Sequence, residues 1–248
     1  MPIGLVKDDQ VELMDQPEWY SNAQTYWTSV QPTVDGMLGG FSQVDPIDVS
    51  GSLEFIDEFV HGLKGANDTM IKSPCLKTTY ACDCGAGIGR VTKNFMLKVP
   101  FDTVDLVEQT PVFVEQAKNT YLADEIKQGQ VGQVICQGLQ TFQPDKNKYD
   151  LIWCQWVLGH LTDDDLTQFF KRCIEGLAPG GLIGVKENNS TADYVVDEED
   201  SSVTRPNEAL KQIFAAAGLT VIKEGIQQGL PAGLFTVRMY MLKPTNTL

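Results

Sequence analysis

Hydrophobic and polar positions follow two different periods along residues 78–243. The clearest helical period lies at 163–177, where apolar residues recur at i, i+3, i+4, i+7, i+8 and i+11. A second helix is predicted at about 207–217, ending at Gly218. Short apolar runs between such segments are typical of strands and cover 78–83, 103–107, 132–136, 149–154, 182–187, 219–224 and 235–243.

The alternation of these strands with helices predicts an α/β fold. Parallel strands joined by helices form a sheet that is covered on both faces, so we expect a seven-stranded, doubly wound, mostly parallel sheet. The last two strands are joined through 227–231, which is too short for a crossover helix. The last strand should therefore run antiparallel to its neighbour.

The segment before residue 71 does not belong to this alternating pattern. Residues 1–16 show little periodicity and are expected to form a flexible N-terminus. Residues 17–70 read as a helical cap, with helices at 18–29 and 53–63 around a glycine-rich stretch at 35–41. A plain packing appendage is the alternative. We assign 71–248 to the ligand-binding domain and expect the cap to belong to the same folding unit.

The most informative motif follows the first strand. Asp83 precedes Gly85, Gly87 and Gly89, and alternate glycines let the backbone turn tightly and approach a ligand. A dinucleotide fingerprint would require its third glycine where Arg90 stands. The D-x-G-x-G-x-G pattern instead resembles the S-adenosylmethionine loop of class I, Rossmann-like methyltransferases. A glycine turn with a purely structural role is the alternative.

Further candidates for a nucleoside site lie where the predicted strands end, because ligands of doubly wound sheets bind there. Glu108 ends the second strand and suits both ribose hydroxyls, and Arg90 suits a carboxylate. Leu139 and Gln140 follow the third strand and suit an adenine, and Gln155 follows the fourth.

Composition narrows the class of partner. The formal net charge of −14 opposes binding to a phosphate backbone, so we expect no nucleic acid. A cationic substrate is easier to accommodate, although acidity also serves solubility alone. The 6 cysteines form no C-x-x-C pair and predict neither a disulfide framework nor a metal site. No apolar run is long enough to cross a membrane. We therefore expect a soluble protein of the cytoplasm, with the nucleus as a second compartment.

Several motifs together resemble the protein α-N-terminal methyltransferases. They lie at 26–27, 33–40, 83–90, 152–161, 186–188 and 200–203, within a resemblance that covers about 20–243. The resemblance implies methyl transfer from S-adenosylmethionine to the free α-amino group of proteins that begin X-Pro-Lys after removal of the initiator Met. S-adenosylhomocysteine would be the other product, and ribosomal proteins are the expected partners.

The same resemblance assigns residues to three tasks. Asp200 and His160 would contact the α-amine, and Asn188 would hold the first residue of the peptide. The residues implied for the cofactor are Gly85, Gly87, Arg90, Glu108, Gln109, Thr110, Leu139, Gln140 and Gln155. Those implied for the peptide substrate are Trp27, Leu38, Gly39, Val44, Trp156, Asp197, Ser202, Leu234 and Phe235.

Two positions depart from the family pattern. Glu108 stands in place of an aspartate, which is a mild change. Phe235 stands where a tyrosine hydroxyl is expected to bond the peptide backbone. Asp197 and Ser202 would receive the cationic third residue, which requires Asp197 to lie in an enclosed groove because exposed ion pairs contribute little.

The chemistry of an α-amine is consistent with these assignments. Its pKa in water is about 8, so most of the substrate arrives protonated and needs a base. Asp200 and His160 are the candidates, against the alternatives of a structural histidine and a solvated acidic loop. A small-molecule methyltransferase and a catalytically silent peptide-binding module remain as rival functions. The number of methyl groups transferred does not follow from the sequence.

Overall fold

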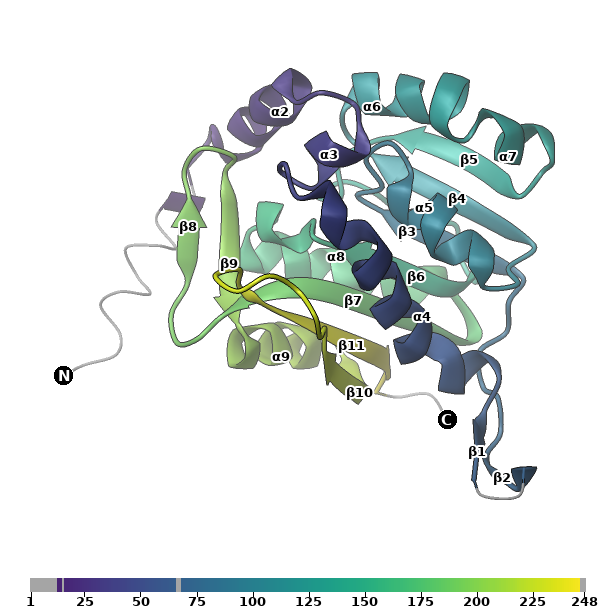
Figure 1. The fold of residues 1–248 in the computed structure, drawn as a ribbon. Coiled ribbons are helices and arrows are strands. Elements are labelled where there is room, and N and C mark those ends of the chain that lie inside the picture. The colour runs from purple at the N-terminus through teal and green to yellow at the C-terminus, as the bar shows by residue number, and fades with distance from the viewer. Residues whose placement is uncertain (1–12, 15, 66–67, 246–248) are drawn as a thin grey trace.

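The computed structural model describes residues 13–14, 16–65 and 68–245, and a twisted central sheet organises them (Figure 1). Its strands lie in the order β10-β11-β7-β6-β3-β4-β5. Strands β3 to β7 run parallel, and β11 runs antiparallel to both β7 and β10, as predicted. Their bounds are β3 (Tyr80–Cys84), β4 (Thr103–Glu108), β5 (Val131–Cys136), β6 (Tyr149–Gln155), β7 (Leu177–Ser190), β10 (Leu219–Ile226) and β11 (Thr236–Pro244).

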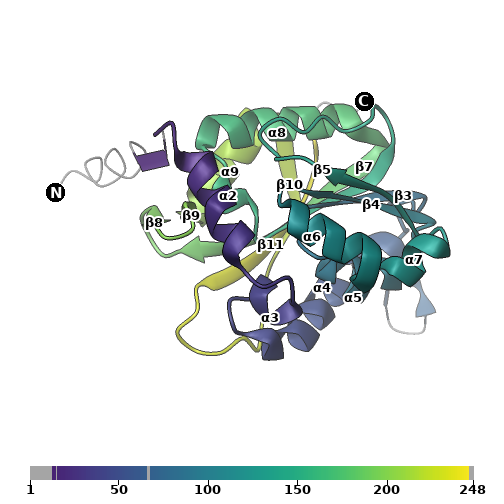
Figure 2. The same cartoon turned by 90° about the horizontal axis from the view of Figure 1, so that it is seen from above.

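Helices cover both faces of the sheet (Figure 2). One face carries α8 (Asp163–Gly176) and α9 (Asn207–Ala216), which match the two helices predicted there. The other carries α4 (Asp45–Val60) and α5 (Arg90–Asn94), with α6 (Pro111–Gln116) and α7 (Ala123–Lys127) farther along the sheet. Along β6, side chains alternate between the two faces, so Cys154 packs in the core under α8 and Trp153 in the core under α4.

The start of α8 illustrates how local sequence sets a boundary. Thr162 is the N-cap, and its Oγ1 accepts the backbone N–H of Asp165 at 3.2 Å. Asp163, Asp164 and Asp165 occupy the first turn, where the helix dipole favours negative charge. The boundary predicted from these residues is confirmed.

The second cap helix begins earlier than predicted. We expected a helix at 53–63, but α4 starts at Asp45 and ends at Val60. Pro46 in its first turn is pre-organised for a helix start, and two acidic residues there complement the dipole. Phe55 and Phe59 of α4 belong to the core under the sheet, so this helix covers the sheet as α5 does.

The remaining cap elements lie near the carboxyl ends of the parallel strands. They are α2 (Trp19–Ser29), α3 (Val34–Met37) and the short turn η1 (Ser42–Val44). The predicted flexible segment 1–16 falls mostly outside the described residues. Within it, Met14 is buried in a small cluster with Trp19 and Tyr194.

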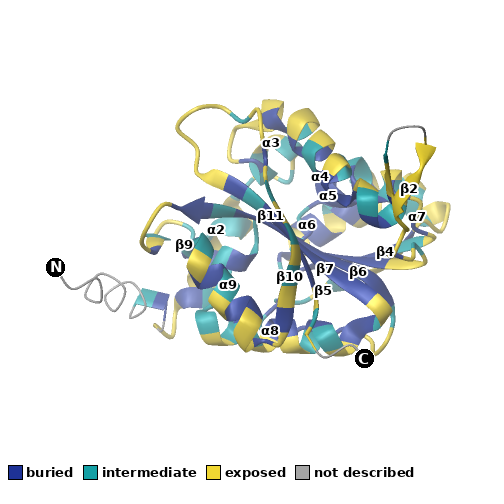
Figure 3. Cartoon of the chain, turned by 90° about the horizontal axis from the view of Figure 1, so that it is seen from below, coloured by how far each residue is buried: buried dark blue, intermediate teal, exposed yellow. Residues whose placement is uncertain are grey.

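Two hairpins were not predicted. β1 (Leu63–Lys64) pairs with β2 (Met70–Lys72) and is exposed, as Figure 3 shows in yellow. β8 (Val195–Asp197) pairs with β9 (Ser202–Pro206), and β9 extends from the end of β7. Both are too short to show a clear period in the sequence.

The cysteines behave as small apolar residues in four cases. Cys82, Cys84, Cys154 and Cys173 are buried and free. Among the residues that the structure describes, no helix combines the length and the apolar character needed to cross a membrane.

The packing of α4 predicts the effect of truncating Phe59, whose side chain is 0% exposed. Phe59→Ala should lower the free energy of unfolding by about 3–5 kcal/mol because it leaves a cavity between α4 and the sheet. Urea denaturation measures this. Ile71→Ala, on the exposed hairpin, is the control and should change stability by less than about 0.5 kcal/mol. Equal effects of the two substitutions would contradict α4 as a core element.

Candidate functional site

Two adjoining cavities open at the carboxyl ends of the parallel strands. The first reaches from the glycine loop after β3 to helix α2. The second lies between α3, the end of β7 and the turn before β9. Both are lined by Trp27, Met37, Trp156 and His160. These four residues, which we call the junction, therefore face both cavities.

The glycine loop forms one wall of the first cavity. Gly85 and Gly87 have φ values of +73° and +56°, in the left-handed region that favours glycine. A Cβ atom would come within 2.3 Å of Val157 Cγ2 at Gly85 and within 2.5 Å of Met37 Sδ at Gly87. The loop therefore needs glycine for its backbone conformation and for space.

Glu108 lies at the end of β4 beside this loop. Its Oε2 accepts the backbone N–H of Gly87 at 2.9 Å, and its Oε1 accepts that of Thr110 at 2.7 Å. A carboxylate has about four acceptor positions, so each oxygen retains capacity for another donor. Because Glu108 also lines the cavity, it can accept hydrogen bonds from a vicinal diol such as that of a ribose.

All but one of the residues predicted for the cofactor line the first cavity. The exception is Thr110, whose side chain is fully buried and whose Oγ1 has no hydrogen-bond partner among the described residues. Its backbone supports Glu108 instead. The residues that do line the cavity are Gly85, Gly87, Arg90, Glu108, Gln109, Leu139, Gln140 and Gln155.

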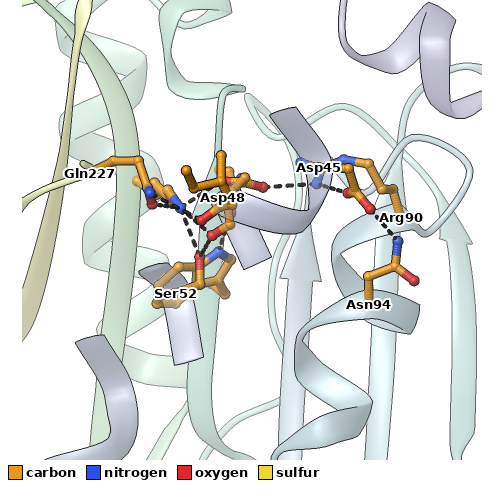
Figure 4. Close-up of polar contacts among 10 residues, drawn as sticks. Asp45, Asp48, Ser52, Arg90, Asn94 and Gln227 are labelled. Carbon is orange, nitrogen blue, oxygen red and sulfur yellow. Dashed lines mark hydrogen bonds and ion pairs between the residues drawn. The ribbon is translucent and has the colours of Figure 1, made fainter. Parts of the chain in front are cut away.

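Arg90 and Gln155 are also held from behind the cavity by helix α4 (Figure 4). Arg90 Nη1 donates to Asp45 Oδ1 at 2.6 Å and to Asp48 Oδ2 at 2.8 Å. Gln155 Nε2 donates to both oxygens of Asp48, at 2.9 and 2.8 Å. The Asp48 carboxylate, which is 1% exposed, therefore links α4 to α5 and to the end of β6.

Lys186 completes this buried cluster from β7. Its Nζ lies 2.5 Å from Asp48 Oδ1 and donates to Ser52 Oγ at 2.9 Å and to Gln227 Oε1 at 2.7 Å. Burial lowers the pKa of Lys186, while the charge of Asp48 opposes that effect. The cluster matters for the first cavity because it fixes Arg90 and Gln155, two side chains that line this cavity, against helix α4.

The second cavity gathers most of the residues predicted for the substrate and for catalysis. Two predicted substrate residues do not line it. Gly39 is an exposed turn residue with a φ of +56°, and Asp197 is exposed at the end of β8. The enclosed groove expected around Asp197 is not formed, since strand β8 lies at the surface. The residues that do line the cavity are Trp27, Leu38, Val44, Trp156, His160, Asn188, Asp200, Ser202, Leu234 and Phe235.

Glu187 is a site residue that sequence reasoning did not assign. It lines the second cavity, and its oxygens accept the backbone N–H groups of Asn188 at 2.9 Å and Leu158 at 3.1 Å. Burial raises its pKa to about 7. Its position between Lys186 and Asn188, at the end of a predicted strand, could have indicated that Glu187 belongs to the site. Phe41 and Leu230 also line this cavity, but no sequence pattern indicated them.

Backbone strain concentrates beside the second cavity. Trp156 and Ser201 have φ values of +52° and +51°, which are uncommon for residues other than glycine. The indole N–H of Trp156 and Oδ1 of Asp200 are buried and have no partner among the described residues. Strained backbone and unpaired polar atoms are typical of functional sites.

These features define a class of protein. A glycine loop after the first parallel strand, an acid at the end of the next strand and a cavity between them form the cofactor site of S-adenosylmethionine-dependent methyltransferases. The described residues contain no group of three or more His, Cys, Asp or Glu side chains that could hold a metal ion. Within the class, the chain belongs to the AdoMet dependent proline di-methyltransferase family, whose model matches residues 15–243.

Individual relatives match over most of their length. An N-terminal Xaa-Pro-Lys N-methyltransferase 1 from Danio rerio is 45% identical over 92% of this chain and 97% of its own. An alpha N-terminal protein methyltransferase 1 from Dictyostelium discoideum is 42% identical over 96% of this chain and 82% of its own. The solved structure of a Leishmania major SAM-dependent methyltransferase superposes with a TM-score of 0.80 at 40% identity, covering 93% of this chain and 86% of that one.

The buried cluster predicts a large effect of Asp48→Asn. Loss of the shared carboxylate removes the charge partner of the buried Lys186 and leaves Arg90 with Asp45 only, which should lower the free energy of unfolding by about 3 kcal/mol or more. Chemical denaturation measures this. Asp45→Asn is the matched control and should have a smaller effect, because its side chain is 18% exposed and, among the described residues, is ion-paired with Arg90 alone. The reverse ranking would show that Asp48 is not the centre of the cluster.

Proposed function

We propose that this protein transfers methyl groups from S-adenosylmethionine to the free α-amino group of protein N-termini of type X-Pro-Lys. The observation that carries the proposal is the junction, where a cavity with nucleoside-binding features meets a second cavity that contains Asp200 and Asn188. The similarity to enzymes named for this substrate, over nearly their whole length, supports it.

The residues of the first cavity fit the cofactor. When bound, S-adenosylmethionine supplies a methyl group attached to a positively charged sulfur. Glu108 has acceptor capacity for the ribose hydroxyls, and Leu139 and Gln140 offer an apolar surface and an amide for the adenine. Arg90 lines the same cavity and suits the carboxylate. The same contacts would hold the product S-adenosylhomocysteine.

The substrate nitrogen must lose a proton before it can attack. Asp200 lines the second cavity and has one buried oxygen without a partner among the described residues. A carboxylate in that position attracts an α-ammonium group and can accept its proton, which leaves the nitrogen lone pair free. Asn188, at the end of β7, has an amide with which to hold the first residue of the peptide.

The walls of the second cavity suit a proline ring at the second position. Leu38, Val44, Leu234 and the ring of Trp156 all line this cavity and provide apolar surface. Because proline fixes φ, a peptide with proline loses less conformational entropy when it enters an extended site. Phe235 lines the cavity without a hydroxyl group, so it adds apolar surface but no hydrogen bond.

Selectivity for lysine at the third position is expected to be modest. Asp197 is exposed, and an exposed carboxylate–ammonium pair contributes only about 0.2–1 kcal/mol. Ser202, which lines the cavity, can add a hydrogen bond. The net charge of −14 favours basic partners in general, which supports ribosomal proteins as substrates. We place the reaction in the cytoplasm, with the nucleus as a second compartment.

A peptide assay tests the function. A peptide beginning Ser-Pro-Lys is incubated with the protein and S-adenosylmethionine, beside the same peptide with an acetylated N-terminus, and mass spectrometry follows both. We expect methyl groups on the free α-amine and none on the blocked peptide. Methylation of small amines but not of the peptide would refute the proposal in favour of a small-molecule methyltransferase. Peptide binding without turnover would indicate a silent binding module.

The role of Asp200 predicts the effect of Asp200→Asn. Turnover should fall by at least about 10²-fold because the amide cannot accept the proton, while S-adenosylhomocysteine affinity stays unchanged. Steady-state kinetics and calorimetric titration measure the two quantities. Asp197→Asn is the control, with KM raised by less than about five-fold and kcat unchanged. Unaltered turnover of Asp200→Asn would remove this residue from the reaction.

A further inference from the structure

His160 lies at the junction, and both nitrogens of its imidazole ring have partners in the chain. The indole Nε1 of Trp27 donates to His160 Nε2 at 3.1 Å. His160 Nδ1 lies 3.0 Å from the backbone oxygen of Ser201. The ring therefore connects helix α2 to the turn that carries Asp200.

These partners determine where the ring proton is. An indole N–H can only donate and a carbonyl oxygen can only accept, so Nε2 must be the acceptor and Nδ1 must carry the proton. The tautomer with its proton on Nδ1 is therefore the form of the ring that satisfies both partners. An imidazolium ion has N–H groups on both nitrogens and would place one against the N–H of Trp27. His160 cannot take a proton at Nε2 unless it first loses Trp27.

Helix α2 holds His160 at three points. Besides the ring contact, Trp19 Nε1 donates to the backbone oxygen of His160 at 2.8 Å. The rings of Trp27 and His160 also pack edge-to-face, with centroids 5.8 Å apart. Phe113 packs edge-to-face with Trp27 in turn. This enclosure keeps the imidazole in one orientation.

The other end of the ring controls the turn at 200–201. Ser201 is 3% exposed and has left-handed backbone, so its carbonyl needs a fixed donor to maintain this strained arrangement. The Nδ1–H of His160 is that donor. Because Asp200 directly precedes Ser201, the hydrogen bond also sets where the Asp200 carboxylate lies.

We infer that Trp27 and His160 are positioning residues and that Asp200 alone accepts the substrate proton. The indole N–H of Trp27 fixes the tautomer of His160, and the Nδ1–H of His160 then holds the turn that carries Asp200. The proton passes from the α-ammonium nitrogen to a carboxylate oxygen of Asp200, and the lone pair remains on nitrogen. The part that concerns the substrate rests on the proposed function. The sequence had indicated His160 as a second base, and its hydrogen bonds argue against that role.

The tautomer can be measured without substrate. The chain contains 2 histidines, so long-range proton–nitrogen NMR of the labelled protein shows two imidazole rings, and His61→Gln assigns them. We expect the neutral Nδ1–H form for His160 at neutral pH. Trp27→Phe keeps an aromatic ring but removes the donor, and the fixed tautomer should be replaced by an exchanging pattern. An Nε2–H or charged ring in the unmodified protein would overturn the inference.

Kinetics test the consequence for catalysis. His160→Asn places an amide N–H near the position of Nδ1, so it retains a donor for Ser201 but has no base. We expect its kcat to stay within about tenfold of the unmodified enzyme, whereas His160→Leu, which has no donor, should lose at least about tenfold more. A loss of about 10²-fold or more in His160→Asn, with S-adenosylhomocysteine binding intact, would restore His160 as the base.

The two measurements separate the inference from the proposed function. If the unmodified protein methylates no peptide, the proposed function fails, but the NMR result still decides the tautomer and the role of Trp27. If the peptide is methylated and the tautomer is wrong, the inference fails alone.

Discussion

The buried carboxylate of Asp48 is the interaction on which the cavity walls depend. An unpaired charge in a protein interior is strongly unfavourable, so Asp48 can remain buried only with its cationic and amide partners in place. Those partners are Arg90 after the glycine loop, Gln155 at the end of β6 and Lys186 on β7. Because each element contributes to the same cluster, helix α4 is fixed on the sheet, and Arg90 and Gln155, which line the first cavity, are held in position.

The two cavities that meet at the junction are formed largely by different parts of the fold. One wall of the first cavity is built by the sheet, since most of its lining follows β3, β4, β5 and β6 and uses glycine where a side chain would collide, while Trp27 and Met37 of the cap close the other side. The second cavity depends on segments outside the alternating pattern, including α3, the turn before β9 and the connection before β11. A methyl donor needs the geometry of the strand ends, whereas a peptide end needs a shaped surface. In this chain, the surface for the peptide is formed by segments that are added to the sheet scaffold.

Local patterns carried the predictions that were confirmed. The positions of the strands along the chain, the antiparallel last strand and the boundaries of α8 follow from periodicity, connection length and capping residues, all of which are properties of neighbouring positions. The glycine loop and Glu108 were found because a short motif and a strand end coincide. The start of α4 at Asp45 was missed although Pro46 and two acidic residues in the first turn are local signals for it. The ion pairs of Asp48 with Arg90 and Lys186 could not be predicted, because these partners come from distant parts of the chain. The same holds for His160, whose hydrogen bonds to Trp27 and Ser201 have no signature in sequence. For Asp197, the residue type could be read from the sequence but its exposure could not, because the surface position of strand β8 depends on its pairing with β9.

The most direct test of the account is a structure of the protein bound to S-adenosylhomocysteine and a peptide beginning Ser-Pro-Lys. The account predicts that the peptide enters the second cavity and that its α-nitrogen faces the cofactor sulfur through the junction, with room for one methyl group between them and with a carboxylate oxygen of Asp200 beside the nitrogen. A peptide bound elsewhere, or an α-nitrogen separated from the sulfur by the side chains of the junction, would contradict it.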